Sequence, residues 1–157
     1  MEIEQDSPRV RFPPPLVFVG VLLIGLGAER FLQLRNFGLD QVTSIGFGVA
    51  LVLVGFAIGL AAVRSFNQAG TRPEPWRAST GIVESGLYRW SRNPMYLGMA
   101  LAYAGFALAF DGPIALILLP VPLLVVRTQV IAREERYLEA KFGSAYLDYK
   151  RRVRRWL

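Results

Sequence analysis

The stretch VTSIGFGVALVLVGFAIGLAAV, residues 42–63, holds 22 residues without one charged side chain. An α-helix rises about 1.5 Å per residue, so this stretch spans the ~30 Å hydrocarbon core of a bilayer. It therefore predicts a transmembrane helix and places the chain among integral membrane proteins. Small residues four positions apart let membrane helices pack closely. We therefore expect another helix to pack against Gly55 and Gly59. Two more glycines precede them, Gly46 and Gly48.

Three shorter apolar segments accompany this helix, at residues 16–34, 94–110 and 113–131. Short connections join the first segment to the second and the third to the fourth, so each pair is predicted to form an antiparallel hairpin. The expected fold is an all-α integral membrane bundle of about four transmembrane helices. Pro120 and Pro122 predict a break in the last one, which either fits a crowded bundle or opens a cavity.

The remaining segments are predicted to lie outside the membrane. Residues 64–93 are too long for a simple connector, since loops of about this length are usually functional or disordered. Apolar and charged side chains alternate in an amphipathic pattern within residues 132–157, which predicts C-terminal helices. Gly143 suits the end of the first helix and Ser144 the cap of the next. Residues 1–157 are thus predicted to form a single membrane domain.

Arginine and lysine predict the orientation. Residues 64–93 contain five arginines and residues 132–157 contain eight basic residues, whereas the two short connections hold only Arg35. Cytoplasmic loops carry an excess of these residues, so both termini and the middle loop are predicted to be cytoplasmic in a multi-pass protein. The basic C-terminal end is expected to lie on anionic membrane lipids. The glycine-rich second helix permits a dimer.

The composition excludes several kinds of chemistry. The chain has no cysteine and no histidine, which removes thiolate nucleophiles, cysteine metal sites and the commonest general base. No metal site is therefore expected. The net charge of +6 lies beside apolar segments, so membrane flanks explain it better than a nucleic-acid partner.

The first candidate site is the motif RNPMYLG at residues 92–98. Asn93 suits the cap of a helix and Pro94 its first residue, so a helix is predicted to begin here at the cytoplasmic face. Its free N–H groups, together with Arg92, suit a carboxylate or phosphate. The alternative interpretation is that Arg92 is an interfacial anchor and that Asn93 and Pro94 merely start a helix.

The second candidate site is the adjacent carboxylate pair Glu134 and Glu135. Two carboxylates just inside the membrane boundary suit an ammonium group and hydroxyl groups. The alternative interpretation is a solvated helical face.

Taken in order, these motifs resemble a known family. The motif at residues 92–98, a hairpin, EExxL at residues 134–138, Phe142-Gly143, Tyr146 and Tyr149 resemble the isoprenylcysteine carboxyl methyltransferase and phospholipid methyltransferase superfamily. The resemblance covers roughly residues 71–155. Asn93 stands where many relatives have histidine, which excludes a mechanism needing an imidazole there.

The resemblance implies a methyltransferase that uses S-adenosylmethionine, releases S-adenosylhomocysteine and methylates a lipophilic acceptor at the cytoplasmic face, most like isoprenylcysteine carboxyl O-methyltransferase. The positions matching the family's cofactor site are Arg92, Asn93, Pro94, Tyr96, Gly98, Glu134 and Glu135. Glu135 and Arg127 are the catalytic candidates. Arg127 stands at a membrane boundary, where a charge is costly unless functional, and it either orients an anionic acceptor group or extends to the headgroups.

Two other functions compete with this interpretation. Membrane sterol-type reductases carry a similar arginine–proline–tyrosine–glycine motif and use NADPH, although this chain has Arg-Glu-Glu where they usually have Arg-Asp-Glu. A small four-helix transporter or adaptor also explains the apolar segments. It does not explain why the polar motifs cluster at helix ends, and the second helix lacks the ionisable residue expected of a transporter.

Overall fold

The computed structural model describes residues 6–33 and 37–157. Helices α1 (Pro14–Leu32) and α2 (Gln41–Gln68) are long and apolar enough to cross a membrane, as is the helical run Pro113–Phe142. Helix α3 (Pro94–Ala109) is apolar but has only 16 residues. Because the described residues contain no β-strand beyond one isolated bridge, the prediction of an all-α protein with membrane-spanning helices is confirmed.

The helical run Pro113–Phe142 is composite. It comprises α4 (Pro113–Ile117), α5 (Pro120–Val125), the π-helix η2 (Val126–Ile131) and α6 (Ala132–Phe142). The regular helix is interrupted just before Pro120, as the two prolines predicted. At about 1.5 Å per residue, 30 residues exceed the hydrocarbon core by half. Since six of the eleven residues of α6 are charged, we end the membrane-spanning part at Ile131.

Some helix ends differ from the predicted ones. Helix α2 continues to Gln68, five residues beyond the predicted end, and its start is capped by the Asp40 carboxylate, which accepts a hydrogen bond from Thr43 N at 2.9 Å. The predicted end of the first helix at residue 34 lies outside the described residues. Gly143, with φ of 54°, ends α6 as predicted. Ser144 begins α7 (Ser144–Arg152) rather than capping it, because the cap position belongs to Gly143.

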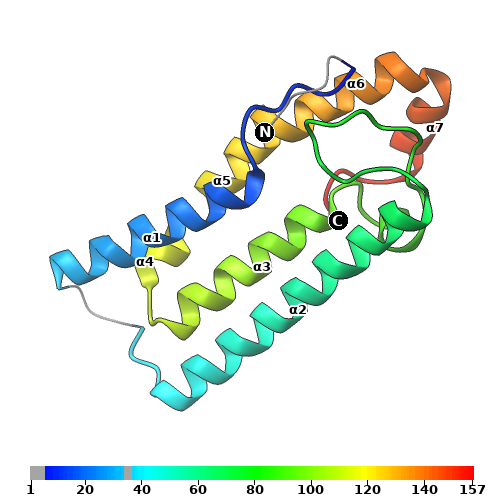
Figure 1. The fold of residues 1–157 in the computed structure, drawn as a ribbon. Helices are drawn as coiled ribbons and strands as arrows, with labels where there is room; N and C mark the ends of the chain where they lie inside the picture. Colours follow the sequence, from blue (N-terminus) through cyan, green and yellow to red (C-terminus); the bar gives the residue numbers. More distant parts are fainter. Residues whose placement is uncertain (1–5, 34–36) are drawn as a thin grey trace.

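Helices α2 and α3 lie side by side and antiparallel (Figure 1). Two glycine pairs allow this approach. A Cβ built on Gly55 would lie 2.5 Å from Gly98 O, and one built on Gly105 would lie 2.5 Å from Gly48 O. The effective spacing on each helix is therefore seven residues, not the predicted four. A Cβ on Gly59 would meet no atom within 4 Å among the described residues.

At the end of the molecule where α1 ends and α4 begins, two carboxylates accept hydrogen bonds from backbone N–H groups of other segments. The Glu29 carboxylate of α1 accepts hydrogen bonds from the backbone N–H groups of Ile114 and Ala115, which begin α4. Asp111 accepts one from Phe37 N at 2.9 Å. Glu29 interrupts the first apolar segment because it satisfies donors at the start of a neighbouring helix.

Candidate functional site

A cavity lies where α3 begins, among α6, α7, the loop between α2 and α3, and the N-terminal segment. Its empty volume is about 830 Å³, part of which is open solvent, and it is lined by both charged and apolar side chains. Figure 1 shows this loop, α6 and α7 gathered at one end of the bundle, with the end of the chain beside the start of α3.

A buried charge cluster forms one wall of the cavity. Arg92 Nη1 lies 2.9 Å from Glu135 Oε1, as an ion pair that is not aligned as a hydrogen bond. Arg155 donates from Nε to Glu135 Oε1 at 3.0 Å and from Nη2 to Oε2 at 2.6 Å. The side chain of Arg92 is 9% exposed, and its buried Nε has no hydrogen-bond partner among the described residues. Glu135 thus holds Arg92 in place, while the Nε–H donor of Arg92 stays without a partner among the described residues.

The start of α3 adds further donors. The helix begins at Pro94, as predicted, but the Asn93 side chain does not cap it. The Asn93 amide instead donates to Arg155 O at 2.9 Å, while Arg92 N donates to Arg154 O at 2.9 Å. Pro94 has no N–H group and Leu97 N already donates to Asn93 O, but no side-chain cap within the described residues satisfies the N–H groups of Met95 and Tyr96, which remain available to an anion beside Arg92.

Glu134 places a carboxyl group in the same cavity as Arg92 and the start of α3. Its Oε1 accepts a hydrogen bond from the Tyr96 hydroxyl at 3.4 Å, and both residues line the cavity. Burial raises the pKa of Glu134 to about 7, and the charge of Glu135 adds to the rise. Glu134 is therefore near its titration midpoint at neutral pH, and a cationic ligand would favour its ionised form.

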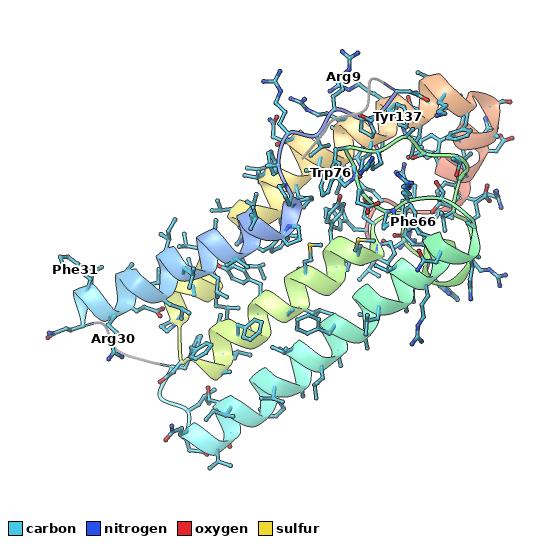
Figure 2. The ribbon with its side chains drawn as sticks, viewed as in Figure 1. Arg9, Arg30, Phe31, Phe66, Trp76 and Tyr137 are labelled. Carbon is cyan, nitrogen blue, oxygen red and sulfur yellow. The ribbon has the colours of Figure 1, made fainter. Side chains whose placement is uncertain are left out.

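Two segments are tied together over the cavity by the hydroxyl of Tyr137 on α6. This hydroxyl accepts a hydrogen bond from Ser79 N of the loop at 3.1 Å and donates one to Asp6 O of the N-terminal segment at 3.1 Å. Figure 2 shows Tyr137, Trp76 of the loop and Arg9 at the same end of the molecule. Burial raises the pKa of Tyr146, which also lines the cavity, to about 12, so this phenol stays neutral.

The sequence also matches known proteins. Residues 43–145, about two thirds of the chain, match the model of the protein family described as phospholipid methyltransferase. The chain belongs to this family. Both candidate motifs fall within the matched residues, and the predicted resemblance to the isoprenylcysteine carboxyl methyltransferase and phospholipid methyltransferase superfamily is confirmed.

Several curated proteins are similar to this phospholipid methyltransferase family member. A protein-S-isoprenylcysteine O-methyltransferase of Saccharomyces cerevisiae is 35% identical over 72 residues, covering 46% of this chain and 30% of the yeast protein. The A form from Arabidopsis thaliana is 28% identical over 109 residues, covering 68% and 55%. An uncharacterised protein of Haemophilus influenzae is 43% identical over 63 residues, which are 40% of this chain and all of that protein. The match thus spans about half or less of the two named enzymes.

The structure of this family member brings most of the predicted site residues together. Those that line the cavity are Arg92, Asn93, Tyr96, Glu134 and Glu135. Pro94, Gly98 and Arg127 are not among the lining residues. Gly98 packs on α2, and Arg127 is exposed on the π-helix one turn before Ile131, which does line the cavity.

Several residues of this site were missed from the sequence, and two of them carry charged groups that bear on its chemistry. Arg155 stands in a basic run that resembles any headgroup-binding tail, and only its partner Glu135, 20 residues away, distinguishes it. Glu74 lines the cavity from the loop, and its Oε2 is buried without a hydrogen-bond partner among the described residues. The sequence feature that could have indicated Glu74 is its position between Pro73 and Pro75, because prolines restrict the backbone around it.

Proposed function

We propose that this chain is an S-adenosylmethionine-dependent methyltransferase that methylates a lipophilic acceptor at the cytoplasmic membrane face and releases S-adenosylhomocysteine. Family membership and the names of the relatives support a methyltransferase. One observation carries the cofactor assignment. A single cavity joins the uncapped start of α3 and the spare donor of Arg92 to the carboxylate of Glu134.

This arrangement fits the methionine end of the cofactor, which is a zwitterion. Arg92 and the first turn of α3 suit its carboxylate, and Glu134 suits its ammonium group. Bound S-adenosylmethionine supplies a methyl carbon made electrophilic by the adjacent sulfonium. The residues of this chain therefore need to bind, align and exclude water rather than form a covalent intermediate.

Glu135 acts on the site through Arg92. Both of its oxygens already accept contacts from arginines, so we assign it the positioning of Arg92 rather than contact with the ammonium group. A carboxylate acceptor is itself a nucleophile and needs no strong general base, which suits a chain without histidine or cysteine.

The acceptor is proposed to be lipophilic because the cavity also has an apolar wall. Met95, Ile131 and Leu138 contribute to it from α3, η2 and α6. Since η2 closes the membrane-spanning part of its helix, an acceptor held in the bilayer reaches this wall without crossing water. A prenylated cysteine carboxylate, as in the names of the relatives, is the first acceptor to test.

The orientation belongs to the same proposal. We propose that α3 is a fourth span within one domain, with both termini, the middle loop and the C-terminal helices cytoplasmic. The chain has no native cysteine, so single cysteines at Gln68 and Leu39 can be labelled with a membrane-impermeant maleimide. We expect labelling at Gln68 only in inverted vesicles and at Leu39 only in intact cells. The reverse pattern would exclude a cytoplasmic site.

The cofactor assignment is tested by calorimetric titration of the detergent-solubilised protein with S-adenosylmethionine and S-adenosylhomocysteine. Glu134→Gln should weaken both, while the control Glu139→Gln on the same helix should not, because Glu139 pairs with Lys150 away from the cavity. Heat from NADPH but from neither sulfur compound would favour the sterol-type reductase. No heat from any ligand, with folded protein, would favour a transporter or adaptor.

A further inference from the structure

The loop between α2 and α3 contributes a carboxylate to the cavity wall from a position outside both candidate motifs, residues 92–98 and 134–135. Glu74 lines the cavity together with the two prolines that flank it, Pro73 and Pro75. Its Oε2 atom is buried and lacks a hydrogen-bond partner within the described part of the chain. A buried acceptor atom without a hydrogen-bond partner opposes folding, so the surrounding loop must hold it there.

Hydrogen bonds within the loop hold the backbone around Glu74. Arg77 N donates to Glu74 O at 3.0 Å, which closes a tight turn. The base of the loop is closed by Thr80, whose N–H donates to Thr71 Oγ1 at 3.0 Å and whose hydroxyl donates to Gly70 O at 3.0 Å. A residue before proline is also restricted to extended conformations, which limits the backbone of Glu74. The carboxylate is thus presented by a preorganised backbone.

The unpaired atoms of the cavity are complementary. Among the described residues, the buried side-chain atoms without a hydrogen-bond partner belong to Arg92, which has only donors, and to Glu74, which has an acceptor. Both residues line the same cavity. A ligand with an anionic group and a separate N–H or O–H donor satisfies both.

We propose that Glu74 is a ligand-binding residue, accepting a hydrogen bond from the adenosyl ligand through either its ammonium group or its ribose diol. The inference rests on the proposed function for the identity of that ligand. It makes the loop a third part of the binding site, beside α3 and α6.

Glu74→Gln tests this proposal through two quantities, the unfolding temperature of the ligand-free protein and its affinity for the ligand, which should not fall together. The unfolding temperature of the ligand-free protein in detergent should stay the same or rise, because the substitution removes a carboxylate whose buried Oε2 has no hydrogen-bond partner among the described residues. The affinity for S-adenosylhomocysteine should fall by about tenfold or more, as expected for a lost hydrogen bond to a charged group. The matched control is Glu84→Gln, since Glu84 belongs to the same loop but pairs with Arg152 Nη2 at 2.7 Å outside the cavity.

A second ligand, 5′-methylthioadenosine, identifies the partner because it keeps the ribose diol but lacks the ammonium group. Weakened binding of S-adenosylhomocysteine alone would assign the ammonium group, and weakened binding of both would assign the diol. Unchanged affinity in Glu74→Gln, or a loss matched by lower stability of the ligand-free protein, would overturn the inference. Failure of the wild type to bind either compound would instead overturn the proposed function.

Discussion

Glu135 is held between two guanidinium groups, and this limits what it can do in the site. Its side chain is 8% exposed, and its two oxygens face Arg92 and Arg155. A carboxylate in that position fixes the arginine that faces the cavity. Glu134, one residue earlier, faces the cavity with only a 3.4 Å hydrogen bond from Tyr96. The two adjacent glutamates therefore have different partners, which the sequence motif alone does not distinguish.

Glu135→Gln should destabilise the protein strongly. It leaves the buried Arg92 without its counter-charge, and breaking such a pair from one side costs about 3 kcal/mol. Chemical unfolding in detergent measures this change. Glu139→Gln should lose less than about 1 kcal/mol, because the side chains of Glu139 and Lys150 are about one-third exposed. Equal losses in the two variants would mean that the buried cluster does not depend on Glu135.

Glu134 should make ligand binding depend on pH. Its pKa is raised from 4.5 to about 7, so between these values the folded protein keeps a proton that the unfolded chain releases. Its contribution to the unfolding free energy therefore falls as pH rises through this window. Ligand affinity should change in the opposite direction, rising about tenfold from pH 6 to 8 as Glu134 ionises. Calorimetry at several pH values measures this, and Glu134→Gln should flatten the profile. A steep profile in that variant would assign the titration elsewhere.

At the scale of helices, the contact between α2 and α3 places the N-terminus of α3 at the cavity. Gly98→Ala should separate these helices, because the new Cβ would lie 2.6 Å from Gly55 O. We expect a loss of about 1–3 kcal/mol in the ligand-free protein, measured by unfolding in detergent. Gly46→Ala is the control, since a Cβ there meets no atom within 4 Å among the described residues. Unchanged stability of Gly98→Ala together with weaker ligand binding would restore the predicted cofactor role of Gly98.

Helix starts were predictable where a local signal fixes them. Pro94 and Pro113 each begin a helix because proline suits the first turn and its missing N–H costs nothing there. The partners of the polar side chains were not predictable in the same way. Asn93 has the local chemistry of a helix cap, yet its amide binds a carbonyl 62 residues away. Tertiary contacts of this kind leave no periodic or local pattern.

At the scale of the whole molecule, the cavity gathers segments from nearly the whole chain. Pro8, Glu74, Arg92 and Glu134 all line it, and Arg155 supports it from near the C-terminus. The motifs around residues 92 and 134 were predictable because their chemistry stands out beside apolar helices. The loop and the tail were not, since prolines and basic residues are also typical of segments with no role in binding.

Arg127 lies near the end of the membrane-spanning part of the helical run Pro113–Phe142. It is exposed on the π-helix, one turn before the cavity-lining Ile131, and we propose that it orients an anionic acceptor arriving from the bilayer. Arg127→Leu should lower methyl transfer to a prenylated cysteine by about tenfold while leaving S-adenosylhomocysteine affinity intact, because only acceptor alignment is lost. The control is Arg30→Leu, another exposed arginine, which Figure 2 shows at the opposite end of the molecule. If both variants transfer methyl groups at the wild-type rate, Arg127 is an interfacial anchor, and the acceptor is aligned by the residues that line the cavity.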